Sequence, residues 1–173
     1  MDYKLLIIQM IGFIGTFFYF ISFQFKNNKT LFRVQFISYI FYSLHFFLLG
    51  AFTGGLSYLV GLTKSFCLSS SNKKLHSKTM CIILCIAQIA VGIITYQGLI
   101  SILPIIANVA AIIAGYSGNA RSIRLVGIFI NSPLWIAHNL YVGSWAGVID
   151  ELITEASMIV SMIRYRFNKR NDD

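Results

Sequence analysis

The stretch SYIFYSLHFFLLGAFTG at residues 38–54 is matched, without a gap, by NSPLWIAHNLYVGSWAG at residues 131–147. Each begins with a polar residue, places a large aromatic residue and a histidine at helical spacing, and ends in a turn with two glycines. The matched pairs, all 93 positions apart, are Ser38 and Asn131, Tyr42 and Trp135, His45 and His138, Gly50 and Gly143, Phe52 and Trp145, and Gly54 and Gly147. Repetition of this kind predicts two like units. In transporters built from parallel repeats, the substrate site lies between such units.

The composition is that of a membrane protein. Of the 173 residues, 57% are hydrophobic and only 12% are charged, and the mean hydropathy is +0.72. A helix of about 20 residues crosses the hydrocarbon layer, so the chain is long enough for several spans. The formal charge of +8 comes from basic residues in short turns and not from an amphipathic face with a stacking platform. The charge therefore indicates membrane topology, and we expect no nucleic-acid partner.

Seven apolar spans can be read along the chain. They cover approximately residues 5–23, 31–49, 55–70, 79–96, 98–116, 123–142 and 147–163. The third span is the shortest and most polar, and its assignment depends on its repeat partner at 147–163. Because backbone polar groups must be satisfied within the bilayer, these spans predict an all-helical membrane protein.

Basic residues predict how the chain is oriented. With seven spans, the basic residues of the first, third and fifth turns and of the C-terminal tail all fall on one side. They are Lys26, Lys29, Arg33, Lys73, Lys74, Lys78, Arg121, Arg124, Arg164, Arg166, Lys169 and Arg170. That side should be cytoplasmic, which puts the N-terminus outside and the C-terminus in the cytoplasm.

The spans group into two units and a linker. Residues 1–72 form the first three-helix unit, residues 73–97 the linker helix, and residues 98–173 the second unit with its basic tail. A single linking span lets both units enter the membrane in the same sense. The predicted repeats are therefore parallel and related by an axis along the membrane normal.

This plan resembles the superfamily of SWEET, PQ-loop and nicotinamide-riboside (PnuC-type) transporters. More closely, the run LHFFLLGAFTG at residues 44–54 and the segment from Trp135 to Glu151 resemble the bacterial inner-membrane YgjV-like family. The resemblance implies a SWEET-like arrangement and a location in the bacterial inner membrane, but it supplies no substrate. The chain lacks the Pro-Gln pair of PQ-loop proteins, so sugar transport does not follow.

Polar side chains within the spans are the candidate site residues. Ser38, Tyr42 and His45 share one helical stripe of the second span, and Asn131, Trp135 and His138 occupy the equivalent stripe of the sixth. Paired stripes could line a shared cavity. Alternatively, each histidine bonds a backbone carbonyl or helix end within the packing, and the sequence favours neither reading.

Lys64 and Glu155 are the charged residues that the sequence places deepest, about 12 to 14 Å inside the outer boundary. An unpaired charge at this depth is costly. We therefore expect an ion pair across the cleft or separate contacts with a polar substrate, the alternative being a structural lock between units. Asn108 adds hydrogen-bonding capacity or bonds a neighbouring helix. Asp150 and Glu151 are expected near the outer interface, in contact with solvent.

These observations predict a transporter or facilitator for a small polar or vitamin-like molecule, working by alternating access. The alternative is a membrane receptor or assembly subunit that binds a peptide, lipid or partner protein. We find no arrangement of nucleophile and base, no metal-ligand spacing and no phosphate loop, and so expect neither an enzyme nor a cofactor. The expected partners are the substrate and the lipid bilayer, and the sequence leaves a homo-oligomer open.

Overall fold

The computed structural model describes residues 3–171, and the side chains as far as Arg164. Throughout this range the chain is helical, with short turns. The elements are α1 (Tyr3–Ser22), α2 (Asn28–Leu48), α3 (Phe52–Ser69), the short helix η1 (Lys73–His76), α4 (Lys78–Ile94), η2 (Leu99–Ser101), α5 (Ile102–Tyr116), α6 (Ala120–Val126), the π-helical turn η3 (Gly127–Asn131), α7 (Ser132–Val142) and α8 (Trp145–Asn171). Because α6, η3 and α7 follow one another without a break, the described residues form seven helical rods at the predicted positions.

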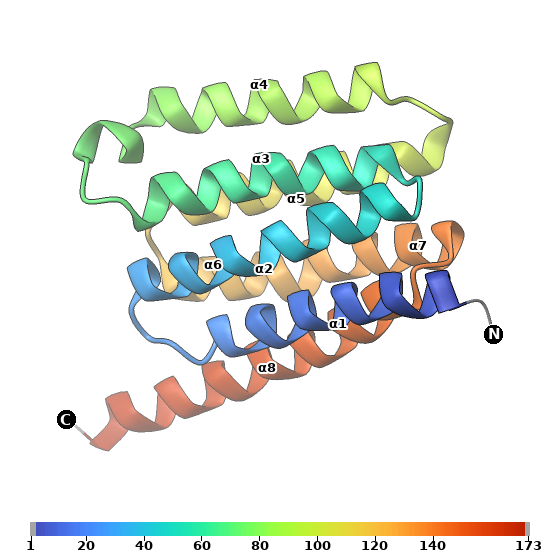
Figure 1. Cartoon of the computed structure of the whole chain (residues 1–173). Coiled ribbons are helices and arrows are strands. Elements are labelled where there is room, and N and C mark those ends of the chain that lie inside the picture. Colours follow the sequence, from blue (N-terminus) through green and yellow to red (C-terminus); the bar gives the residue numbers. More distant parts are fainter. Residues whose placement is uncertain (1–2, 172–173) are drawn as a thin grey trace.

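The seven rods lie side by side and alternate in direction (Figure 1). The turns at 23–27, 70–77 and 117–119 therefore lie at the same end as the C-terminal part of α8. We call this the basic end, because these turns, the helical residues next to them and the C-terminal part of α8 carry the lysines and arginines named above. The turns at 49–51, 95–98 and 143–144 form the opposite end, where they contain neither lysine nor arginine.

Four of the rods are long and apolar enough to cross a membrane. They are α1, α2, the segment Leu99–Tyr116 and the segment Ala120–Val142, while α4 is apolar but shorter. The α3 and α8 rods are more polar, and most of their polar side chains are buried. Ser57, Lys64 and Ser65 of α3 and Thr154 of α8 are at most 5% exposed. The outer surface of the bundle is rich in exposed isoleucine, leucine and phenylalanine, as a surface facing lipid requires.

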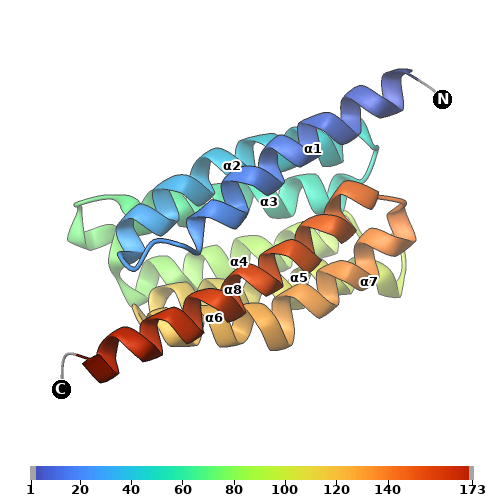
Figure 2. The same ribbon diagram turned by 90° about the horizontal axis from the view of Figure 1, so that it is seen from below.

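Helices are arranged in the same order within the two units (Figure 2). In the first unit α2 contacts both α1 and α3, and in the second α7 contacts both α5 and α8. Between the units, α1 contacts α8, and α3 contacts α5. If the two units are exchanged, α1 takes the place of α5 and α8 that of α3, so the contact between α1 and α8 becomes the contact between α5 and α3. Two like units are expected to pair in this way. The linker α4 packs against α3 and α5 at the edge of the bundle. The likeness of the whole arrangement to the SWEET plan stays a prediction.

Glycines of the repeated motif have the same geometry in both units. Gly50 and Gly143, in the turns, have φ angles of +76° and +70°, in the left-handed region that glycine adopts without steric cost. Gly54 and Gly147 allow the next helix to pack closely on the previous one. A Cβ atom at either position would lie 2.6 Å from the side chain of the residue eight positions earlier.

The basic end of the bundle should face the cytoplasm. In a variant whose Cys67, Cys81 and Cys85 are replaced by alanine, a membrane-impermeant maleimide added outside spheroplasts should label Gln97→Cys, in an exposed turn at the opposite end. It should spare Asn72→Cys, in an exposed turn at the basic end, until the membrane is permeabilised. Labelling is read by mass shift, and the reverse pattern would contradict the orientation.

Candidate functional site

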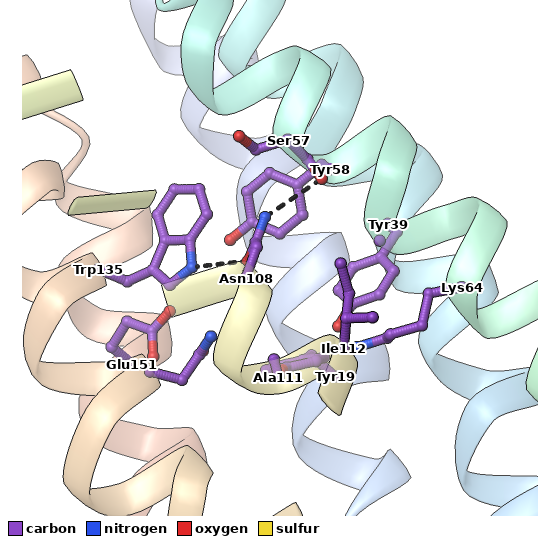
Figure 3. A pocket seen from close by; sticks show the side chains of 12 residues that line it. Tyr19, Tyr39, Ser57, Tyr58, Lys64, Asn108, Ala111, Ile112, Trp135 and Glu151 are labelled. Carbon is purple, nitrogen blue, oxygen red and sulfur yellow. Dashed lines mark hydrogen bonds between the residues drawn. The ribbon is translucent and has the colours of Figure 1, made fainter. Parts of the chain in front are cut away.

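A small enclosed pocket lies where the two units meet (Figure 3). The first unit contributes Tyr19, Tyr39, Ser57, Tyr58, Gly61 and Lys64, and the second contributes Asn108, Ala111, Ile112, Asn131, Trp135 and Glu151. The cavity is about 20 Å³, which is room for about one water molecule. The structure therefore shows the pocket closed around its own side chains.

Aromatic rings from both units form one wall of the pocket. Tyr58 of α3 packs against Trp135 of α7, with ring centroids 4.8 Å apart, and against Tyr39 of α2 at 5.6 Å. On its other side Tyr58 stacks on Tyr42 at 4.9 Å. This wall is thus built across the boundary between the units, and a movement of one unit against the other would disturb it.

Lys64 provides the positive charge of the pocket. It lies on α3, five residues before the end of the helix, and is 5% exposed. Its Nζ atom lies 5.6 Å from the ring centre of Tyr39 and 5.8 Å from that of Phe32, in the range of cation–π attraction. Within the part of the chain whose side chains are described, no carboxylate or other hydrogen-bond partner contacts Nζ.

Glu151 provides the carboxyl group of the pocket, and its burial corrects an expectation from the sequence. Asp150 and Glu151 were expected near the solvent, but they are 1% and 2% exposed. Asp150 accepts a hydrogen bond from Thr154 Oγ1 at 3.2 Å. Glu151 reaches the pocket, and its buried Oε2 atom has no hydrogen-bond partner among the described residues. Both are covered because the first turns of α8 pack against α1 and α7.

Amide side chains link four helices at the pocket. Asn108 Nδ2 donates to the Ser57 carbonyl at 3.3 Å, and Asn108 Oδ1 accepts from Trp135 Nε1 at 3.3 Å. Gln88 Nε2, on the linker α4, donates to Ser57 Oγ at 2.8 Å. Asn131 Nδ2 donates to the Ala107 carbonyl at 3.0 Å. Asn108 thus both bonds a neighbouring helix and faces the pocket.

The polar stripe of the first unit does not face the pocket. Ser38 Oγ donates to the Gly15 carbonyl at 2.9 Å, and Tyr42 OH donates to Thr16 Oγ1 at 3.1 Å. His45 Nδ1 donates to the Ile8 carbonyl at 2.8 Å, because a carbonyl oxygen can only accept. These three side chains tie α2 to α1. For His45, the structure shows the backbone-carbonyl contact that the sequence left open as the alternative to cavity lining.

The stripe of the second unit is divided between pocket and packing. Asn131 and Trp135 line the pocket, whereas His138 is 2% exposed and packs edge-on against Trp135, with centroids 5.4 Å apart. Glu155 is half-buried, does not line the pocket, and forms no ion pair with Lys64 in the described structure. The carboxylate that shares the pocket with Lys64 is Glu151, one turn earlier on α8.

The repeat itself contains a signal for residues that the sequence reasoning missed. Tyr58 and Glu151 are 93 positions apart, as are Tyr19 and Ile112, and all four line the pocket. The repeat spacing, applied to the third helix of each unit, makes Glu151 the equivalent of Tyr58, an aromatic residue that faces inward. The repeat would therefore have predicted that Glu151 faces inward too. Hydropathy alone places it near the membrane surface.

Hydrogen bonds between the units close the pocket at the opposite end. His45 Nε2 accepts from Ser144 Oγ at 3.0 Å, and Gln9 Oε1 accepts from the Ala146 backbone amide at 3.1 Å. The first contact joins α2 to the turn that precedes α8, and the second joins α1 to the first turn of α8.

A second set of hydrogen bonds closes the basic end. Arg124, 1% exposed, donates from Nη2 to the Phe23 carbonyl at 2.9 Å and from Nε to Ser161 Oγ at 2.6 Å. Gln24 Nε2 donates to Ser157 Oγ at 2.6 Å. The pocket therefore lies between two separate polar contacts that join the units.

Residues 3–171 contain no cluster of three or more histidine, cysteine, aspartate or glutamate side chains that could hold a metal ion.

Comparison with known proteins places the chain in a family. Residues 6–169 match Imp-YgjV, a family of bacterial inner membrane proteins. The match covers nearly the whole chain, so the protein belongs to this family. No curated protein and no solved structure matches the chain. The family assignment agrees with the apolar outer surface of the bundle.

Arg124 should be far more important for stability than its exposed neighbour Arg121. Arg124→Gln removes charge-assisted hydrogen bonds to the first unit and to α8, each worth about 1.5–3 kcal/mol. We expect a clear fall in the thermal unfolding midpoint of the purified protein. The matched control Arg121→Gln, at an exposed position, should change stability by less than about 0.5 kcal/mol. Equal effects would show that the contacts of Arg124 add nothing.

Proposed function

We propose that this protein is a transporter or facilitator in the bacterial inner membrane, which moves a small polar metabolite by alternating access between its two three-helix units. The observation that carries this proposal is the closed polar pocket between the units, with Lys64 on one side and Glu151 on the other. Ionisable side chains within membrane helices are costly and typically mark a substrate or ion pathway.

The position of the pocket supports transport. It is lined by all six helices of the two units, counting α6, η3 and α7 as one rod, and by no residue of the peripheral linker α4. In transporters with internal repeats, the substrate site lies near the middle of the membrane at the repeat interface, and one unit rocks against the other around it. A pocket between the two units is what such a mechanism requires.

The closures support the same mechanism. At the opposite end, the contacts are His45 with Ser144 and Gln9 with Ala146. At the basic end, they are formed by Arg124 and Gln24. Hydrogen bonds between membrane helices are worth about 0.6 kcal/mol on average, so the few neutral contacts at the opposite end can open at modest cost. The charge-assisted bonds of Arg124 make the basic end the tighter closure. Opening one end while the other stays closed would expose the pocket to one side at a time.

Accessibility of the pocket from each side of the membrane tests this proposal. In the cysteine-free background, Ala111→Cys places a small thiol in the pocket. We expect a small impermeant methanethiosulfonate to label it both in right-side-out and in inside-out vesicles, with mass spectrometry as the readout. Ile113→Cys, on the exposed apolar surface of the same helix, is the matched control and should stay unlabelled within lipid.

A crosslink separates transport from a receptor role. Oxidation of a Gln9→Cys and Ala146→Cys pair should fix the opposite end closed, because α1 packs against the start of α8 there and the Gln9 side chain contacts Ala146. Labelling of Ala111→Cys should then persist only from the basic end. Labelling of the uncrosslinked protein from one side alone would contradict alternating access and would favour a receptor or assembly subunit.

A further inference from the structure

We propose that the substrate of this pocket is a small zwitterion of the amino-acid type, whose carboxylate binds Lys64 and whose ammonium group binds Glu151. This inference rests on the proposed function and names the substrate class of the same site. It starts from Lys64 and Glu151, whose polar groups lack a full set of hydrogen-bond partners in the closed pocket.

Both charged groups are buried and have unused bonding capacity. Lys64 is 5% exposed and its Nζ atom contacts only the rings of Tyr39 and Phe32. Glu151 is 2% exposed, and its Oε2 atom has no hydrogen-bond partner within the described structure. Buried polar groups are otherwise almost always hydrogen-bonded, and an exception calls for an explanation. Two such groups in one pocket point to a ligand that satisfies both.

The charges determine which ligand class fits. An anion would pair with Lys64 but would place a second negative charge beside Glu151. A cation would pair with Glu151 and leave Lys64 without a counter-charge. A neutral polar molecule such as a sugar would leave both charges uncompensated. A zwitterion alone supplies both opposite charges while adding no net charge to the membrane interior.

The pocket also determines the orientation of this ligand. Both α3 and α8 begin at the opposite end and run toward the basic end. Glu151 lies six residues from the start of α8 and Lys64 twelve from the start of α3, so Lys64 is nearer the basic end. Figure 3 shows the two side chains on different sides of the pocket. The carboxylate of the ligand therefore points toward the basic end and its ammonium group toward the opposite end.

The aromatic wall suits the remainder of such a ligand. Figure 3 shows Trp135 on the side of Glu151 and Tyr39 on the side of Lys64, and Tyr58 packs against both rings. Their faces provide apolar contact for a short carbon chain and cation–π attraction for an ammonium group. Because the closed pocket holds about 20 Å³, the units must separate to admit the ligand, and a small ligand requires the smallest separation.

A thermal-shift series on the purified full-length protein tests the substrate class. The probes are ω-amino carboxylates from glycine to 6-aminohexanoate and the common α-amino acids, each with its carboxamide and its N-acetyl derivative. We expect at least one zwitterion to raise the unfolding midpoint in a saturable manner. Its carboxamide and its N-acetyl derivative should each bind at least tenfold more weakly, since each lacks one of the two charges.

Substitutions assign each charge to its residue. Lys64→Met should abolish the preference for the acid over the carboxamide and keep the preference for the free amine. Glu151→Gln should do the reverse. Glu155→Gln, one turn along α8 and outside the pocket, is the matched control and should keep both preferences. If Lys64→Met does not fold, Lys64→Arg should fold and retain the preference for the acid.

Failure of this inference is distinguishable from failure of the proposed function. If no zwitterion stabilises the protein, or if both preferences survive in the Lys64 and Glu151 variants, the substrate class is wrong. Two-sided labelling of Ala111→Cys would still support transport in that case. If a zwitterion binds with the expected preferences but Ala111→Cys is labelled from one side only, the substrate class stands and alternating access fails.

Discussion

The structure depends on one constraint: inside a bilayer, a polar group finds its partner within the protein or has none. Helices α3 and α8 carry many polar residues, and both direct most of them inward. Many of these groups are satisfied locally, as where Thr154 Oγ1 donates to Asp150 and Ser161 Oγ to the Met158 carbonyl. Ser65 Oγ, Glu151 Oε2 and the Lys64 ammonium have no hydrogen-bond partner in the described structure. Of these, Lys64 and Glu151 bring their incompletely satisfied groups to one pocket.

Much of the fold could be predicted because its determinants are local. The apolar spans, the glycine turns and the 93-residue repeat indicated all seven rods, including α3, which falls outside the set of rods that are apolar enough to span by composition. The π-helical turn η3 was not predicted. It contacts α5 and α8 and lies just before Pro133, which lacks the amide hydrogen for a regular helical hydrogen bond to the preceding turn.

The candidate site was predicted less completely, for a physical reason. Lys64, Asn108, Asn131 and Trp135 face the pocket, but Ser38, Tyr42 and His45 bond α1. A helical stripe shows which face of a helix is polar, and it does not show which neighbour that face meets. Glu151 was likewise expected at the membrane surface, because its depth was counted along α8 alone. Its burial comes from α1 and α7, which pack over the start of α8.

The repeat is regular in its backbone turns but not in its charges. Position 64 corresponds to Ser157 and position 151 to Tyr58, so each charge occurs in only one unit. Two identical parallel units would present every charge twice, related by an axis along the membrane normal, and a bound molecule could face either unit. Because the sequences of the two units differ at these positions, that equivalence is lost. The interior thereby has an amine on one unit and a carboxyl group on the other, and a molecule with two different ends would face only one way between the units.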